Sequence, residues 1–270
     1  MDLGQDAKAT AQRAANSRWL EWLARLGLVA RGVVYLLIGA LALRIALGDS
    51  GSQADQGGAV RAIADKPFGS MVLWLLAAGF TGLALWRFSE TAFGDDKGER
   101  AKSFARGLLY AFFAVTTFAF VLGKSGSAVQ DSDEKSTGAT AQVMEHGGGR
   151  TAVAVAGLVL IGIGCYMAYE GITRKFLEEL RTGEMSSSVR RVVEKLGVFG
   201  SVARGVVFGL AGVFVLYAAI TFDPGKAKGL DGTLRSLADA PLGPYLLGLV
   251  AIGLIAFGAF SMCEARWRRL

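Results

Sequence analysis

Three arginines and three glutamates stand at matching places along the apolar stretches of the chain. The tripeptide Ala-Arg-Gly opens an apolar stretch at Arg31, Arg106 and Arg204. A glutamate closes a second apolar stretch 59, 64 and 60 residues later, at Glu90, Glu170 and Glu264. A lone charged side chain near the centre of a bilayer costs about 2.5–3.5 kcal/mol, and pairing offsets part of that cost. The spacing therefore predicts Arg–Glu ion pairs, either within one repeat or between neighbouring repeats.

The repeated charges fit three kinds of chemistry. The favoured interpretation is that ion pairs hold helical hairpins in register. One alternative is a ring of charges around a central cavity or pore mouth, which would select ions. The other is that the arginines bind lipid phosphates. Arg44 lies 13 residues beyond Arg31 and has no charged counterpart in the other repeats. We expect it to snorkel to the outer interface, and it would be the best additional functional charge if it pointed inward.

Motifs for catalysis and for cofactors are missing from the sequence. The chain has one histidine, His146, and no Gly-x-x-x-x-Gly-Lys, Cys-x-x-Cys or Gly-x-Ser-x-Gly string. We therefore predict no catalytic residue, no metal site and no cofactor. The acidic groups at 95–96, 131–134 and 178–179 are interpreted as solvated loop charges. The two cysteines lie inside predicted helices, which excludes a disulfide framework.

Glycines recur on the faces of the apolar stretches. Small residues allow membrane helices to approach closely, and helix association in a bilayer depends on such packing. The predicted packing glycines are Gly32, Gly39, Gly107, Gly205, Gly209 and Gly212.

The elements that must position these residues are long apolar helices. Of the 270 residues, 52% are hydrophobic and only 19% are charged, and the apolar residues come in blocks of helix-spanning length. The blocks do not alternate, which argues against a membrane barrel. Six transmembrane helices are predicted, at about 26–47, 68–89, 104–123, 151–169, 199–222 and 242–263.

The six spans form three tandem two-helix repeats, for which a pseudo-threefold arrangement is one expectation. The predicted segments are an N-terminal cytoplasmic or interfacial segment at 1–22, repeats at 23–94, 99–176 and 196–270, and a cytoplasmic amphipathic linker at 177–195. Short helices are expected at 58–65 and 232–239, before Pro67 and Pro241. Repeat two lacks this proline, and a long polar loop is expected at 125–149. Ser187 is the predicted N-cap of the helix that ends the linker.

The distribution of positive charge predicts the orientation in the membrane. The net charge is +6, and 20 of the 29 Lys and Arg fall on the side that holds both termini. The positive-inside rule therefore places both termini in the cytoplasm. The basic surplus is expected to contact anionic lipids rather than nucleic acid. The oligomeric state is left open.

The Ala-Arg-Gly-x-x-aromatic entry, the Pro-x-Gly restart and the glutamate exit, repeated in a six-span chain, resemble the bacterial integral-membrane proteins of domain-of-unknown-function family 1206. The resemblance covers about residues 20–270. It implies three two-helix repeats and a plasma-membrane location, and it implies no reaction. The expected function is a non-enzymatic scaffold or accessory protein with a membrane or cytoplasmic protein partner. The alternatives are a small channel or transporter and a lipid head-group binding protein.

Overall fold

The computed structural model describes residues 18–49, 51–93, 97–123, 132–146 and 148–269. Most of the predicted N-terminal segment at 1–22 lies outside these residues. Within the described ranges the regular elements are all helices, and none is a β-strand. The all-α class predicted from the sequence is confirmed.

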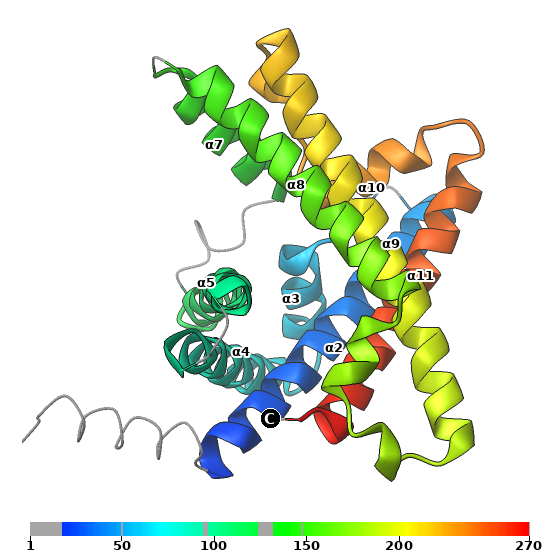
Figure 1. Cartoon of the computed structure of the whole chain (residues 1–270). Coiled ribbons are helices and arrows are strands. Elements are labelled where there is room, and N and C mark those ends of the chain that lie inside the picture. The colour runs from blue at the N-terminus through cyan, green and yellow to red at the C-terminus, as the bar shows by residue number, and fades with distance from the viewer. Residues whose placement is uncertain (1–17, 50, 94–96, 124–131, 147, 270) are drawn as a thin grey trace, which may run out of the picture. The chain divides into compact units, whose positions relative to one another are not determined.

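Among the residues that the structure describes, six helices are long and apolar enough to cross a membrane (Figure 1). They are α2 (Arg18–Ala46), α4 (Gly69–Phe93), α5 (Lys97–Val121), α8 (Gly149–Ile172), α9 (Ser187–Thr221) and α11 (Gly243–Trp267). The shortest, α8, has 24 residues. At about 1.5 Å per residue it reaches about 36 Å, more than the roughly 30 Å of hydrocarbon in a bilayer. Each helix overlaps one predicted span.

Three short helices lie in the connections inside the three repeats. They are α3 (Gln56–Ala64), α7 (Ser132–Met144) and α10 (Leu230–Ala238). The first and the third stand where short helices were predicted. The second occupies part of the expected polar loop, so that expectation was wrong for 132–144. Its sequence lacks an apolar face, and a short polar helix depends on tertiary contacts rather than on its own propensity.

The turn from each short helix into the next long helix is the same in all three repeats. It contains a residue in the left-handed region, with φ of 65° at Phe68, 85° at Gly148 and 60° at Leu242. A glycine follows each time, at Gly69, Gly149 and Gly243. A Cβ on that glycine would lie 1.7–2.2 Å from a carbonyl oxygen of the short helix. Glycine is therefore required at this point, and repeat two makes the turn without the proline.

The linker and the fifth span share one helix. Helix α9 runs 35 residues without interruption, after two short 3-10 turns, η1 (Lys175–Glu179) and η2 (Thr182–Glu184). Its N-cap is Ser186, whose side chain accepts from the Val189 N–H at 3.4 Å, so the predicted cap at Ser187 is off by one residue. At about 50 Å this helix exceeds the hydrocarbon thickness, so part of it extends beyond the apolar layer.

The chain divides into two compact units, which are described separately. Unit 1 comprises residues 1–31, 63–128 and 261–270, and unit 2 comprises residues 32–62 and 129–260. Unit 1 therefore contains α4 and α5 with the first part of α2 and the end of α11. Unit 2 contains the rest of α2 and of α11, nearly all of α3, the helices α7, α8, α9 and α10, and the turn η3 (Pro224–Lys226).

Helices α8 and α9 of unit 2 pack side by side through glycine (Figure 1). A Cβ on Gly164 would lie 2.6 Å from both the Gly205 oxygen and the Gly209 nitrogen. Gly157 and Gly212 make a similar approach one or two turns away, at 3.0 Å from the added Cβ of Gly157 to the Gly212 oxygen. The two backbones are close because no side chain separates them, as expected for helices packed in a membrane.

Candidate functional site

The buried guanidinium of Arg31 is the centre of a polar cluster in unit 1. Arg31 lies on α2, and its Nε donates to the Ser261 Oγ of α11 at 2.8 Å. Its Nη1 donates to the Tyr110 hydroxyl of α5 at 3.0 Å, and its Nη2 is paired with the Glu264 carboxylate. One guanidinium therefore connects three helices by charge-assisted hydrogen bonds, which are the strong kind.

The Glu264 carboxylate lies between two arginines. While Oε2 binds Arg31, Oε1 accepts from the Arg268 Nη1 at 2.7 Å; Arg268 lies four residues after Glu264, directly beyond the end of α11. The side chains of Arg31, Glu264 and Arg268 are all at least 90% buried. A carboxylate bound on both oxygens, with no open face, is suited to holding helices together rather than to accepting a proton from a substrate.

A second ion pair in unit 1 involves Glu90 of α4. The Arg87 Nη1 donates to Glu90 Oε2 at 2.7 Å, and the Ser103 hydroxyl of α5 donates to the same oxygen at 2.9 Å. The Arg87 guanidinium also lies over the Trp86 ring, 4.4 Å from its centroid. The sequence interpretation missed Arg87. The i,i+3 spacing to Glu90, which places both on one helix face, was the available signal.

The other predicted charges are less buried. Arg106 on α5 and Glu170 on α8 are half-buried. Arg44, near the end of α2, is 64% exposed and forms an ion pair with Asp49 at 2.5 Å. The pKa of Asp49 is held below its ordinary value of 3.8. The largest cause is the hydrogen bond from the Gly51 N–H, and the Ser52 hydroxyl and the charge of Arg44 lower the pKa further. Arg44 is thus exposed at the end of a helix.

Arg204 on α9 has an aromatic environment in unit 2. Its guanidinium carbon is 4.0 Å from the ring centroid of Phe257, 4.9 Å from that of Tyr35 and 5.9 Å from that of Phe208. The Nε atom is buried and has no hydrogen-bond partner. Arg31, its counterpart in repeat one, is instead surrounded by oxygen atoms, so the two equivalent arginines have different chemistry.

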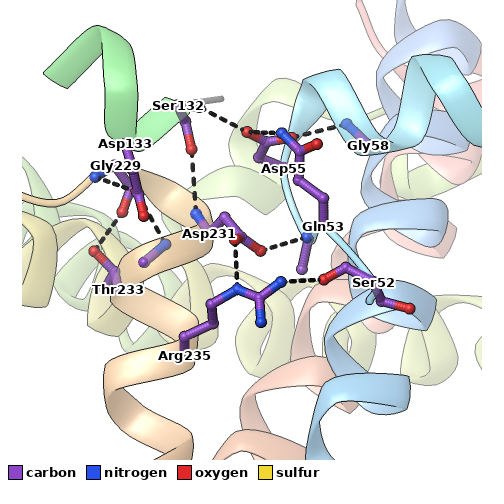
Figure 2. A network of polar contacts seen from close by, with 12 residues as sticks. Ser52, Gln53, Asp55, Gly58, Ser132, Asp133, Gly229, Asp231, Thr233 and Arg235 are labelled. Atoms are coloured by element: carbon purple, nitrogen blue, oxygen red, sulfur yellow. Dashed lines mark hydrogen bonds and ion pairs between the residues drawn. The ribbon is translucent and has the colours of Figure 1, made fainter. Parts of the chain in front are cut away.

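Three aspartates near the starts of the short helices connect the repeats within unit 2 (Figure 2). We call Asp55, Asp133 and Asp231 the aspartate ring. Asp55, directly before α3, accepts from the Ser132 N–H of α7 at 3.0 Å. Asp231, in the first turn of α10, accepts from the Ala54 N–H ahead of α3 at 2.6 Å. Repeat one is thus bound to repeat two, and repeat three to repeat one.

The remaining link joins repeat two to repeat three. Asp133 of α7 accepts from the backbone N–H groups of Gly229 and Gly232, at 2.7 and 3.0 Å. The three links therefore run from one repeat to the next in a closed cycle. Each carboxylate binds the backbone near the start of a helix, where N–H groups lack partners inside the helix and the macrodipole favours negative charge. Each of the three repeats is therefore linked to both of the others through these carboxylates.

Further contacts fix two members of the ring (Figure 2). Asp55 also accepts from the Gly58 N–H at 2.8 Å, so it serves as the N-cap of α3. Asp231 also pairs with the Arg235 Nε at 2.7 Å, and the Arg235 Nη2 donates to the Ser52 carbonyl at 2.5 Å. Burial raises the pKa of Asp231 above 3.8, and the nearby Asp55 charge adds to the rise, while Arg235 and the Ala54 N–H oppose it.

The sequence interpretation missed the aspartate ring and treated the acidic group that contains Asp133 as solvated. That interpretation was wrong for Asp133, which binds two backbone N–H groups. An acidic residue beside the predicted start of a short helix was the available signal, because such residues cap helices. In the part of the chain that the structure describes, no group of three or more His, Cys, Asp or Glu is arranged to hold a metal ion.

The predicted glycines lie at close helix contacts. A Cβ on Gly39 would lie 2.9 Å from the Ala251 oxygen of α11, and a Cβ on Gly107 would lie 2.8 Å from the Phe88 ring of α4. The Gly32 oxygen is 2.8 Å from the place of a Cβ on Gly258. Gly205 and Gly212 face α8, where an added Cβ would lie 2.6 and 2.7 Å from backbone atoms of α8, whereas a Cβ on Gly209 would meet no atom within 4 Å. Their partners on α8, Gly157 and Gly164, are equally close to the backbone of α9, at 2.7 and 2.6 Å from an added Cβ.

The fold and its repeated charges define an all-α membrane protein made of three two-helix repeats. The profile of the family described as Domain of Unknown Function (DUF1206) matches three times, at residues 26–94, 101–174 and 199–268. The chain belongs to this family, which confirms the resemblance seen in the motifs. It is 28% identical over 261 residues to the "Uncharacterized protein YxxB" of Bacillus subtilis (strain 168), across 93% of this chain and 92% of that protein. No solved structure matches the chain.

Proposed function

We propose that this protein is a non-enzymatic scaffold or accessory protein of the bacterial plasma membrane. The observation that supports this proposal is that its most buried ionic groups bind one another. The Arg31 guanidinium and the Glu264 carboxylate are engaged by Ser261, Tyr110 and Arg268. A reactive centre keeps at least one group available to its substrate, whereas a network that occupies its own members maintains helix register.

The proposed location is the inner membrane, with both termini in the cytoplasm. The support is that the relative belongs to a bacterium, and that 20 of the 29 basic residues lie on the side of the termini. Fusion of a fluorescent protein that matures only in the cytoplasm after residue 270 tests this orientation. A fluorescent fusion is expected, and a dark but well-expressed fusion would contradict it.

The proposed partner-binding surface is the charged linker between the fourth and fifth spans. Arg190 and Arg191 are exposed in the first turns of α9, and most of η2 is exposed beside them. Part of α9 extends beyond the apolar layer, so these side chains stand in the aqueous phase or among head groups. Mixed charges on a protruding helix suit an acidic or mixed-charge protein surface.

Site-specific photocrosslinking in cells tests the scaffold proposal. A photoreactive amino acid in place of Arg191 is expected to give a discrete crosslinked protein. The same residue in place of the exposed Glu145, which the proposed topology assigns to the other side of the membrane, should not give that product. Absence of any crosslink at 191 and at its neighbour 190 would count against the proposal.

Reconstitution separates the scaffold from a channel or transporter. Purified protein in liposomes is expected to give no ion flux above that of empty liposomes. A saturable flux that disappears in a folded Glu264→Gln variant would refute the scaffold proposal and would favour a transporter with a central charged cavity.

A further inference from the structure

Helix α9 exposes one continuous apolar stripe along its length. Its members are three, four or seven positions apart, which is the spacing of a single helix face. The exposed members of this stripe are Phe199, Val206, Val213, Tyr217 and Ile220. Other faces of α9 carry the helix contacts. A Cβ on Gly205 would lie 2.6 Å from the Gly164 oxygen of α8, and a Cβ on Gly200 would lie 2.6 Å from the backbone of α11. The stripe therefore points away from both α8 and α11.

The length of the stripe matches the apolar layer of a bilayer. Phe199 and Ile220 are 21 residues apart, which is about 32 Å along the helix axis. The hydrocarbon of a bilayer is about 30 Å thick, and each head-group layer adds about 5–7 Å. Phe199 therefore marks one edge of the hydrocarbon, and the residues of α9 that precede it lie at head-group level or beyond.

Helix α8 places this edge at the same level. A Cβ on Gly171 would lie 3.3 Å from the Val198 oxygen, so the end of α8 lies beside the start of the stripe. Ile172, the last residue of α8, is 65% exposed. Three residues later the Lys175 Nζ lies 5.1 Å from the ring centroid of the exposed Tyr169. Tyrosine rings are enriched where a span leaves the apolar layer, and lysine side chains extend from there to the head groups. Both helices thus change from apolar to basic at one level.

Lys195 stands on the stripe one helical turn before Phe199. At about 6 Å from Phe199 along the axis, it lies within the head-group layer. Its side chain is exposed and has no ion pair within the part of the chain that the structure describes. The adjacent carboxylate, Glu194, is instead paired with Arg174 at 2.7 Å. A cation at this level without a carboxylate partner of its own attracts the negative charge of lipid head groups.

We propose that Lys195 binds the phosphate of an anionic phospholipid head group, with an acyl chain of that lipid lying along the stripe. Arg191, one turn further out, is about 12 Å from Phe199 and so lies beyond the head-group layer. The inference is independent of the scaffold proposal, because it assigns a lipid to Lys195 and requires no protein partner. It requires a preference for negative head groups, since a zwitterionic lipid carries its own compensating positive charge.

Native mass spectrometry of the full-length detergent-solubilised protein tests the proposal. Titration with phosphatidylglycerol and with phosphatidylcholine of the same acyl chains is expected to show tighter binding of the first by the wild type. Lys195→Gln should weaken phosphatidylglycerol binding about fivefold and leave phosphatidylcholine binding nearly unchanged. Arg191→Gln removes the same charge one turn further out and should weaken binding less. Lys226→Gln, which removes an exposed lysine in the turn η3, is the matched control and should bind like the wild type.

A thermal shift gives a second readout, after size-exclusion chromatography has confirmed that each variant is folded. Phosphatidylglycerol should raise the melting temperature of the wild type more than that of Lys195→Gln. This difference should shrink as the salt concentration rises from about 50 to about 500 mM, because salt screens the charges. Equal phosphatidylglycerol binding by the wild type and Lys195→Gln would overturn the proposal. A larger loss in Arg191→Gln than in Lys195→Gln would also overturn it, because the head group would then be bound beyond the level of Lys195.

Discussion

Replacing Glu264 by glutamine removes one buried negative charge and keeps the size of the side chain. The carboxylate accepts hydrogen bonds from Arg31 and Arg268, each worth about 1.5–3 kcal/mol as a charge-assisted bond. Glutamine keeps one acceptor oxygen but leaves two buried guanidinium groups without a counter-charge. Because breaking a buried pair on one side typically costs about 3–5 kcal/mol, we expect a loss of that size.

The loss is measurable as a lower melting temperature. At about 2–4 °C per kcal/mol for a chain of this size, Glu264→Gln should melt about 6–20 °C below the wild type. The assay is tryptophan fluorescence on heating in nanodiscs, with size-exclusion chromatography to confirm that the variant starts folded. Glu21→Gln is the control, because Glu21 pairs with Arg25 at a surface where 40% of its side chain is exposed. Such a pair is worth about 0–1 kcal/mol.

Two results would refute the reasoning about Glu264. One is a melting temperature for Glu264→Gln within about 2 °C of that for Glu21→Gln, which would mean that water or lipid already screens the buried pair. The other is simple additivity of Arg31→Gln and Glu264→Gln. Groups in direct contact should couple by about 0.5–3 kcal/mol, so the double variant should be less destabilised than the sum of the two changes.

Three further predictions concern unit 2. Gly164→Ala should destabilise the protein by about 1–3 kcal/mol, because the added Cβ meets the α9 backbone. The control is Gly162→Ala on the same helix, where the added Cβ has open space and should not lower the stability. Equal melting temperatures for the two variants would contradict the glycine contact. Asp133→Ala should speed hydrogen exchange at the Gly229 and Gly232 amides by leaving two N–H groups unpaired, whereas the exposed Glu145→Ala should leave those rates unchanged. Burial raises the pKa of Asp231, so this carboxyl holds its proton more tightly in the folded protein than in the unfolded chain. The contribution of Asp231 to the free energy of unfolding is therefore full below pH 3.8, and it is lost as the pH rises through the pKa of the folded state. The free energy of unfolding of the wild type relative to Asp231→Asn should therefore fall as the pH rises through that window in denaturant titrations, and a relative rise would show that the sign is wrong.

The spans could be predicted because length and hydropathy are properties of a segment. A stretch such as 151–169 needs no knowledge of its neighbours to be identified as a helix, since its backbone groups must bind one another in an apolar phase. The boundary at Ser186 was missed by one residue, as helix ends depend on local side-chain geometry. Helix α7 was missed altogether, because its polar residues carry no periodic signal.

The partners of the repeated charges could not be predicted in the same way. The motif Ala-Arg-Gly is the same at Arg31 and Arg204, yet the first binds a carboxylate and the second lies among rings. The difference arises from the helices that surround each position, because a side chain such as Phe257 is more than fifty residues away in sequence from the arginine that it contacts.

The sequence by itself determined the class of the protein, the six spans, the triple repeat and the residues with charge in an apolar setting. These follow from composition and spacing, which act over a few turns of helix. Only the tertiary structure decided which groups meet. Arg31 binds Glu264, three aspartates link each repeat to the next in a closed cycle, and Arg204 lies among aromatic rings. The physical reason is that ion pairing and hydrogen bonding act across a few ångströms, so they depend on which residues folding brings together and not on their distance along the chain.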